Sequence, residues 1–82
     1  MLNQSIIIGK VVEVHRKDNM DTRVVLETKD GFVPVWFPIL LEEKVSVDDL
    51  IAIKGTVYNN TFADDGSVKV MVEKYTNTKG EK

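Results

Sequence analysis

Residues 22–37 read Thr-Arg-Val-Val-Leu-Glu-Thr-Lys-Asp-Gly-Phe-Val-Pro-Val-Trp-Phe, and this stretch decides the fold. Two runs rich in β-branched and aromatic residues lie on either side of Asp30-Gly31. An Asp-Gly pair between such runs is typical of the two-residue loop of a β-hairpin. The stretch therefore predicts two antiparallel strands, at 22–29 and 32–37.

A loop made of Asp30 and Gly31 fixes which residues face each other across this hairpin. It places Val25 opposite Trp36 and Glu27 opposite Pro34, and Lys29 then faces Phe32. Side chains alternate between the two faces of a strand. One face is mostly aliphatic and is predicted to be core: Val24, Leu26, Thr28, Val33, Val35 and Phe37. The other face mixes aromatic, charged and small apolar residues: Arg23, Val25, Glu27, Lys29, Phe32, Pro34 and Trp36.

This second face has an unusual composition for a surface that only contacts water. Aromatic rings set among cations are the combination that binds single-stranded nucleic acid, because bases stack on the rings. The alternative is that the register differs by one residue and Trp36 belongs to the core. The sequence leaves both interpretations open.

The size and composition of the chain restrict the possible functions. At 82 residues and 43% hydrophobic content, the chain is expected to form one globular domain. Without cysteine it has no disulfide and no thiolate metal site, which fits a cytoplasmic protein. We also expect no signal peptide and no membrane span, because the start lacks a basic region and all apolar runs are short.

The net charge of −2 argues against binding of duplex DNA through many phosphate contacts. Single-strand binding remains open, because stacking supplies part of the affinity and cations need only line one groove.

The remaining β-type runs complete a small barrel. Residues 6–14, 50–58 and 67–75 are predicted as strands, and Gly9 and Gly55 mark bends in the first and fourth. Ile39–Lys44 is predicted to form a short helix. Five strands with a short helix between the third and fourth are the plan of the OB-fold, an all-β Greek-key barrel. The periodicity alone supports only a small all-β barrel or an SH3-like barrel. We assign residues 1–76 to this domain and expect residues 77–82 to be a frayed polar C-terminus.

Three segments, in order, resemble bacterial single-stranded DNA-binding proteins. Residues 1–11, Met-Leu-Asn-Gln-Ser-Ile-Ile-Ile-Gly-Lys-Val, resemble their opening, where an Asn and an apolar run lead to a Gly. Residues 49–57, Asp-Leu-Ile-Ala-Ile-Lys-Gly-Thr-Val, resemble their fourth strand. Val35-Trp36-Phe37 resembles their third strand, which carries an aromatic residue that stacks on a base. The resemblance implies sequence-independent binding of single-stranded DNA in replication, recombination or repair, with either Trp36 or Phe37 as the stacking residue.

The chain also departs from this family. The stretch between Phe37 and Gly55 is shorter, and the hairpin loop between the second and third strands is reduced to a tight turn. The aromatic residue of the second strand is replaced by aliphatic residues. The glycine-rich tail and its acidic tip, which recruit replication and repair enzymes in the family, have no counterpart in this sequence, so the resemblance does not extend to that role.

The predicted binding groove combines aromatic and basic side chains from several strands. Trp36 and Phe32 are its stacking residues. The flanking cations and the aromatic residues at the rim are Arg23, Lys29, Lys54, Lys69, Tyr58 and Phe62. Each also has an alternative interpretation: the lysines as solvated strand residues, Phe62 as a loop residue covering the barrel end, and Tyr58 as a residue packed on the helix.

Nothing in the sequence predicts catalysis, a metal or a cofactor. His15 is the only histidine and is predicted to lie in a loop, and no nucleophile–base set or phosphate-binding glycine loop is recognisable. Two other function classes stay open. One is an RNA-binding barrel of the initiation-factor or S1 type, and the other is a protein-interaction module in a replication complex.

The first strand predicts self-association. Ile6, Ile7 and Ile8 are consecutive, so they cannot all face one core. In the resembled family, first strands pair across a dimer. We therefore expect a homodimer or tetramer formed through this strand.

Overall fold

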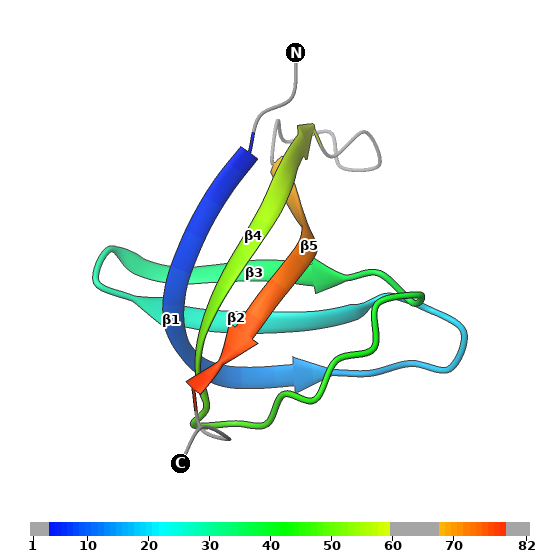
Figure 1. Ribbon diagram of the computed structural model, residues 1–82, viewed down its shortest axis with the longest axis horizontal. Helices are drawn as coiled ribbons and strands as arrows, with labels where there is room; N and C mark the ends of the chain where they lie inside the picture. The colour runs from blue at the N-terminus through cyan, green and yellow to red at the C-terminus, as the bar shows by residue number, and fades with distance from the viewer. Residues whose placement is uncertain (1–3, 60–67, 79–82) are drawn as a thin grey trace.

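The computed structural model describes residues 4–59 and 68–78. Its five strands close into a barrel with the order β1-β2-β3-β5-β4 (Figure 1). All neighbouring strands are antiparallel except β3 and β5, which are parallel. This confirms the predicted all-β, OB-fold type of barrel. The strands are β1 (Gln4–His15), β2 (Thr22–Thr28), β3 (Gly31–Phe37), β4 (Leu50–Asn59) and β5 (Val68–Asn77).

Strand β1 is long and changes partners along its length. Residues 4–10 pair with β4, whereas the pairing with β2 begins at Lys10 and continues to His15. Gly9 lies at this change of partner. The strand β1 as a whole curves strongly (Figure 1). A Cβ atom on Gly9 would lie 2.8 Å from the Glu27 carbonyl oxygen, so β1 can cross β2 this closely only with a glycine.

The hairpin has the predicted faces but a different register. Its two loop residues are Lys29 and Asp30, because Thr28 pairs with Gly31. The Thr28 hydroxyl accepts a hydrogen bond from the Asp30 amide at 3.1 Å and donates one to the Gly31 carbonyl at 3.0 Å. Gly31 has a φ of 123°, a conformation that favours glycine. Partners are therefore displaced by two residues, and Arg23 lies opposite Trp36.

A displacement by two residues leaves every side chain on its predicted face. Val24, Leu26, Val35 and Phe37 are buried, and Trp36 is half-buried on the outer face. The alternative that places Trp36 in the core is therefore wrong. The core is completed by aliphatic residues of the other strands and of the connector, residues 38–49 between β3 and β4: Val11, Val45, Ile51, Ile53, Val70 and Val72.

The predicted helix at Ile39–Lys44 is wrong, because residues 38–49 contain no helix. Their backbone groups bond elsewhere. After a turn in which the Leu41 amide donates to Pro38, the connector runs beside β1. There the Asp48 amide donates to Val11, and the Val11 amide donates to Asp49, both at 2.8 Å. The buried Val45 side chain fastens the connector to the core.

Strand β5 extends further than expected, to Asn77. The Asn77 side-chain amide donates to the Lys44 carbonyl at 3.0 Å and to the Asp49 carboxylate at 2.7 Å. The barrel thus includes Asn77, one residue past the predicted boundary, whereas residues 79–82 lie outside the described part. Among the described residues, no helix is long and apolar enough to span a membrane.

Gly55 is the second bend, and we expect Gly55→Ala to destabilise the barrel. The β4–β5 register shifts between Lys54 and Gly55. An added Cβ would lie 2.6 Å from the Met71 carbonyl oxygen, so the backbone must move. We expect a loss of about 1–3 kcal/mol in the free energy of unfolding, measured by urea denaturation followed by circular dichroism. Thr76→Ala, on the exposed side of β5, is the control and should change it by less than about 0.5 kcal/mol. Equal midpoints for the two variants would contradict the prediction.

Candidate nucleic-acid interface

The pairing of strands places a row of polar and aromatic side chains across the outside of the barrel. His15, the last residue of β1, lies opposite Arg23 of β2. Arg23 in turn lies opposite Trp36 of β3, and Trp36 pairs with Met71 of β5. Directly opposed residues have Cβ atoms about 4.5–5.5 Å apart, so neighbouring side chains in this row can contact one ligand.

The row continues from Trp36 onto β5 and β4. The Lys69 ammonium of β5 lies over the Trp36 ring, 5.0 Å from its centroid, which is the geometry of a cation–π interaction. Lys69 pairs with Tyr58 of β4, whose side chain is 52% exposed. Cations and aromatic rings thus alternate across all five strands. We call this row the outer belt: His15, Arg23, Trp36, Lys69 and Tyr58.

A pocket of about 290 Å³ adjoins Trp36 on the side of β1 and β2. Its volume lies just below the range for small-ligand sites, about 300–1,000 Å³. It combines an aromatic ring, a thioether, cations and one carboxylate. The lining residues are His15, Lys17, Met20, Asp21, Arg23 and Trp36.

The loop that forms one wall of this pocket is held at both ends by the connector. At its start, Arg16 donates to the Glu43 carboxylate at 2.7 and 3.1 Å and to the Val45 carbonyl at 2.7 Å. The hydrogen bond to Glu43 raises the pKa of Arg16 above its ordinary value. At its end, the Asp21 carboxylate accepts the Ile39 amide at 3.2 Å. Arg16 is thus engaged within the protein, and Lys17 and Arg23 are the cations that face the pocket.

Phe32 is exposed but stands apart from the outer belt. It is 68% exposed and lies on the same face of β3 as Trp36, four residues away. That spacing corresponds to about 13 Å along a strand. Phe32 faces Glu27, which lies 4.0 Å from the Lys10 ammonium. It can therefore contact a different nucleotide from the one at Trp36, beside an ion pair.

The structure does not bring the remaining predicted residues to the outer belt. Lys29 is in the hairpin loop and lines a separate groove with Ile6, Ile7 and Ile8. Lys54 lies between Ile6 of β1 and Lys74 of β5, on another part of the barrel surface. Phe62 lies outside the described residues.

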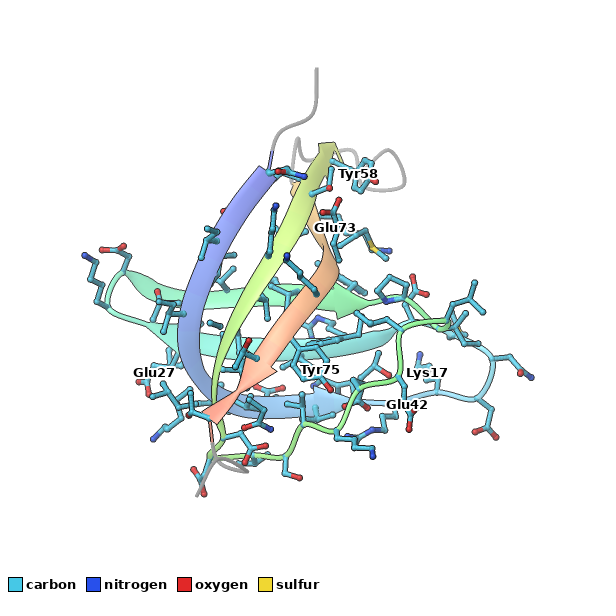
Figure 2. The ribbon with its side chains drawn as sticks, viewed as in Figure 1. Lys17, Glu27, Glu42, Tyr58, Glu73 and Tyr75 are labelled. Atoms are coloured by element: carbon cyan, nitrogen blue, oxygen red, sulfur yellow. The ribbon has the colours of Figure 1, made fainter. Side chains whose placement is uncertain are left out.

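Negative charges also lie close to the outer belt. The Glu13 carboxylate lies 2.7 Å from the His15 imidazole. Glu73 accepts hydrogen bonds from Thr56 and Gln4, and Figure 2 shows Glu73 and Tyr58 toward the same end of β4 and β5. A surface of mixed charge makes few net phosphate contacts, so a ligand there must gain affinity from stacking.

Sequence reasoning missed several residues of the site. His15 was predicted to be in a loop but is the end of β1, because a bulge between Val11 and Glu13 aligns it with Arg23. Met20 and Asp21 carried no recognisable motif. Only the hairpin register could have predicted that Arg23 lies opposite Trp36, and this register depends on the hydrogen bonds of the Thr28 hydroxyl.

Comparison with models of known protein families finds no match to the chain. Comparison with curated proteins also finds no match. The outer belt and its pocket are therefore the observations from which a function can be inferred.

Proposed function

We propose that the protein binds single-stranded DNA without sequence specificity along the outer belt, and acts in DNA replication, recombination or repair. The observation that carries this proposal is the position of Trp36 between two cations. Lys69 lies over its ring and Arg23 faces it across the β2–β3 pair. A base stacked on such a ring contributes about 1–3 kcal/mol, and the adjacent cations can contact its phosphates.

Single strands suit this surface better than a duplex does. Bases in a duplex are stacked on each other, so the face of Trp36 has no partner there. Duplex binding depends on many phosphate contacts, whereas this chain carries a net charge of −2 and Glu13 lies beside His15 of the outer belt. Both arguments favour a single strand, whose bases are not paired and stacked within a duplex.

Fluorescence of Trp36 tests the proposal directly, because it is the only tryptophan. The protein is titrated with oligo-dT, oligo-U and a duplex of equal length, at low and at high salt. We expect strong quenching by oligo-dT, weaker quenching by oligo-U and little by duplex. Stronger quenching by oligo-U would favour the RNA-binding barrel. No binding to any of them at low salt would favour the protein-interaction module.

We further propose that the protein forms a homodimer, or a tetramer built from it, through β1. Over residues 4–9, β1 pairs with β4 on one edge, while pairing with β2 begins only at Lys10. Ile6 and Ile8 point outward and are 74% and 62% exposed, whereas Ile7 packs against the core. An unpaired strand edge with exposed isoleucines can pair with the same edge of a second copy about a two-fold axis.

We expect Ile8→Lys to dissociate this dimer, because the lysine ammonium would lose its hydration at the β1–β1 interface without gaining a partner. Light scattering at micromolar concentration should give about two or four times 9.3 kDa for the wild type, as a dimer or a tetramer, and a lower mass for the variant. Leu40→Lys is the matched control, since Leu40 is 95% exposed in the connector and should leave the mass unchanged. A monomeric wild type would refute the dimer, while leaving the DNA-binding proposal intact.

A further inference from the structure

The pocket beside Trp36 contains one side chain that can only accept hydrogen bonds. Lys17 and Arg23 can only donate them, and Trp36 and Met20 offer mainly apolar surface. His15 is already within 2.7 Å of Glu13. The acceptor is the carboxylate of Asp21, which lies at the wall formed by the 16–21 loop.

Asp21 is held in place by the connector. Its Oδ1 atom accepts the Ile39 amide at 3.2 Å. Ile39 lies in a turn that the Leu41 amide closes by donating to the Pro38 carbonyl at 2.9 Å. Within residues 4–59 and 68–78, this carboxylate makes no other hydrogen bond. Its second oxygen can therefore accept a hydrogen bond from a ligand in the pocket, without a change in the loop.

Nucleobases differ in what they offer to such an acceptor. Cytosine has an amino group on C4, which donates, whereas thymine has a carbonyl oxygen there, which accepts. A carboxylate opposite the thymine oxygen leaves two acceptors facing each other and both unpaired. Stacking on Trp36 is available to both bases and does not distinguish them.

We propose that this pocket binds one base of the single strand and prefers a base with an exocyclic amino group, cytosine over thymine, because of Asp21. The proposal rests on the proposed function and adds a modest base preference to it. We expect about a tenfold difference in Kd between the two bases, equivalent to about 1.4 kcal/mol. This is close to the contribution of one hydrogen bond to a charged group.

The test compares two labelled oligonucleotides of equal length, one of thymidine and one of 5-methyldeoxycytidine. The two bases share ring size and methyl group and differ in the groups at C4 and N3. Fluorescence anisotropy at neutral pH should show about tenfold tighter binding of the 5-methylcytosine strand to the wild type. Equal affinities, or tighter binding of the thymidine strand, would overturn the preference while the proposed function stands. If neither strand binds, both proposals fail.

Asp21→Asn tests whether this residue causes the preference for cytosine over thymine. An asparagine oxygen can still accept the Ile39 amide, but its NH₂ group can donate to the thymine oxygen. We expect the preference for 5-methylcytosine to be lost, with the Kd of the thymidine strand equal to or below that of the 5-methylcytosine strand. Asp18→Asn, in the same loop and exposed, removes the same charge and should keep the wild-type ratio. A tenfold ratio that survives in Asp21→Asn would refute the assignment; if that variant does not fold, the wild-type comparison decides.

Discussion

Replacing Trp36 by alanine is expected to weaken oligo-dT binding by about 5- to 150-fold, with a smaller loss of stability than Phe37→Ala causes. This range corresponds to the 1–3 kcal/mol that a base stacked on an aromatic residue contributes. Trp36 is half-buried on the outer face and does not belong to the buried core, so its removal leaves that core packed. The variant also removes the ring that holds Lys69 at 5.0 Å, so one change affects both stacking and the nearest cation.

Anisotropy of a labelled oligonucleotide is the appropriate measurement, because the variant has lost its fluorescent residue. Trp36→Phe keeps an aromatic face and should lose less affinity than Trp36→Ala. Phe32→Ala is the comparison and should lose less affinity than Trp36→Ala, since Phe32 is also aromatic and exposed on β3 but lies off the outer belt. If Phe32→Ala weakens binding more than Trp36→Ala does, the strand follows the hairpin toward its loop, and the outer belt is not the main interface.

Alternation along the hairpin was predictable because it survives errors of register. The predicted partners were displaced by two residues, and two is the period of a strand. Val24, Val35 and Trp36 therefore stayed on the faces assigned to them. A displacement by one residue would have exchanged core and surface.

The neighbours of Trp36 were not predictable, because they depend on side-chain bonds and on strand order. The Thr28 hydroxyl selects Lys29 and Asp30 as the loop, and this brings Arg23 opposite Trp36. Alternation shows that a side chain points outward, but outward-pointing side chains of a barrel can lie on opposite sides of the molecule. Lys54 and Lys69 are both outward, yet Lys69 alone reaches Trp36, because β5 lies between β3 and β4.

The predicted helix failed for a related reason. Ile39 to Lys44 contains good helix formers, but local propensity is weak against tertiary contacts. The Lys44 amide donates to the Tyr75 hydroxyl at 2.8 Å, and Asn77 donates to the Lys44 carbonyl. These partners come from β5, far along the chain, so no local pattern predicts them.

Phe37→Ala is expected to lower the free energy of unfolding by about 3–5 kcal/mol, the cost of removing a buried aromatic side chain. Phe37 is 1% exposed and packs edge-to-face on Tyr75, with ring centroids 5.1 Å apart. Tyr75 in turn accepts the Lys44 amide, so the loss also loosens the connector. Small domains have about 5–15 kcal/mol of stability in total, so the variant should be partly unfolded at room temperature if the wild type lies at the low end of this range. Urea denaturation followed by circular dichroism measures this loss, and Phe37→Leu should lose less.

The comparison of Phe37 with Trp36 decides which of two adjacent aromatic residues carries the proposed function. A buried ring cannot stack on a base unless the barrel opens, so Phe37→Ala should reduce binding only in proportion to the unfolded fraction. Trp36→Ala should reduce binding even when the variant is fully folded. The two losses can be separated by adding enough of a stabilising osmolyte to refold Phe37→Ala, which should then restore its binding. If refolded Phe37→Ala still fails to bind while Trp36→Ala binds normally, then Phe37 is the stacking residue and the faces of β3 are reversed.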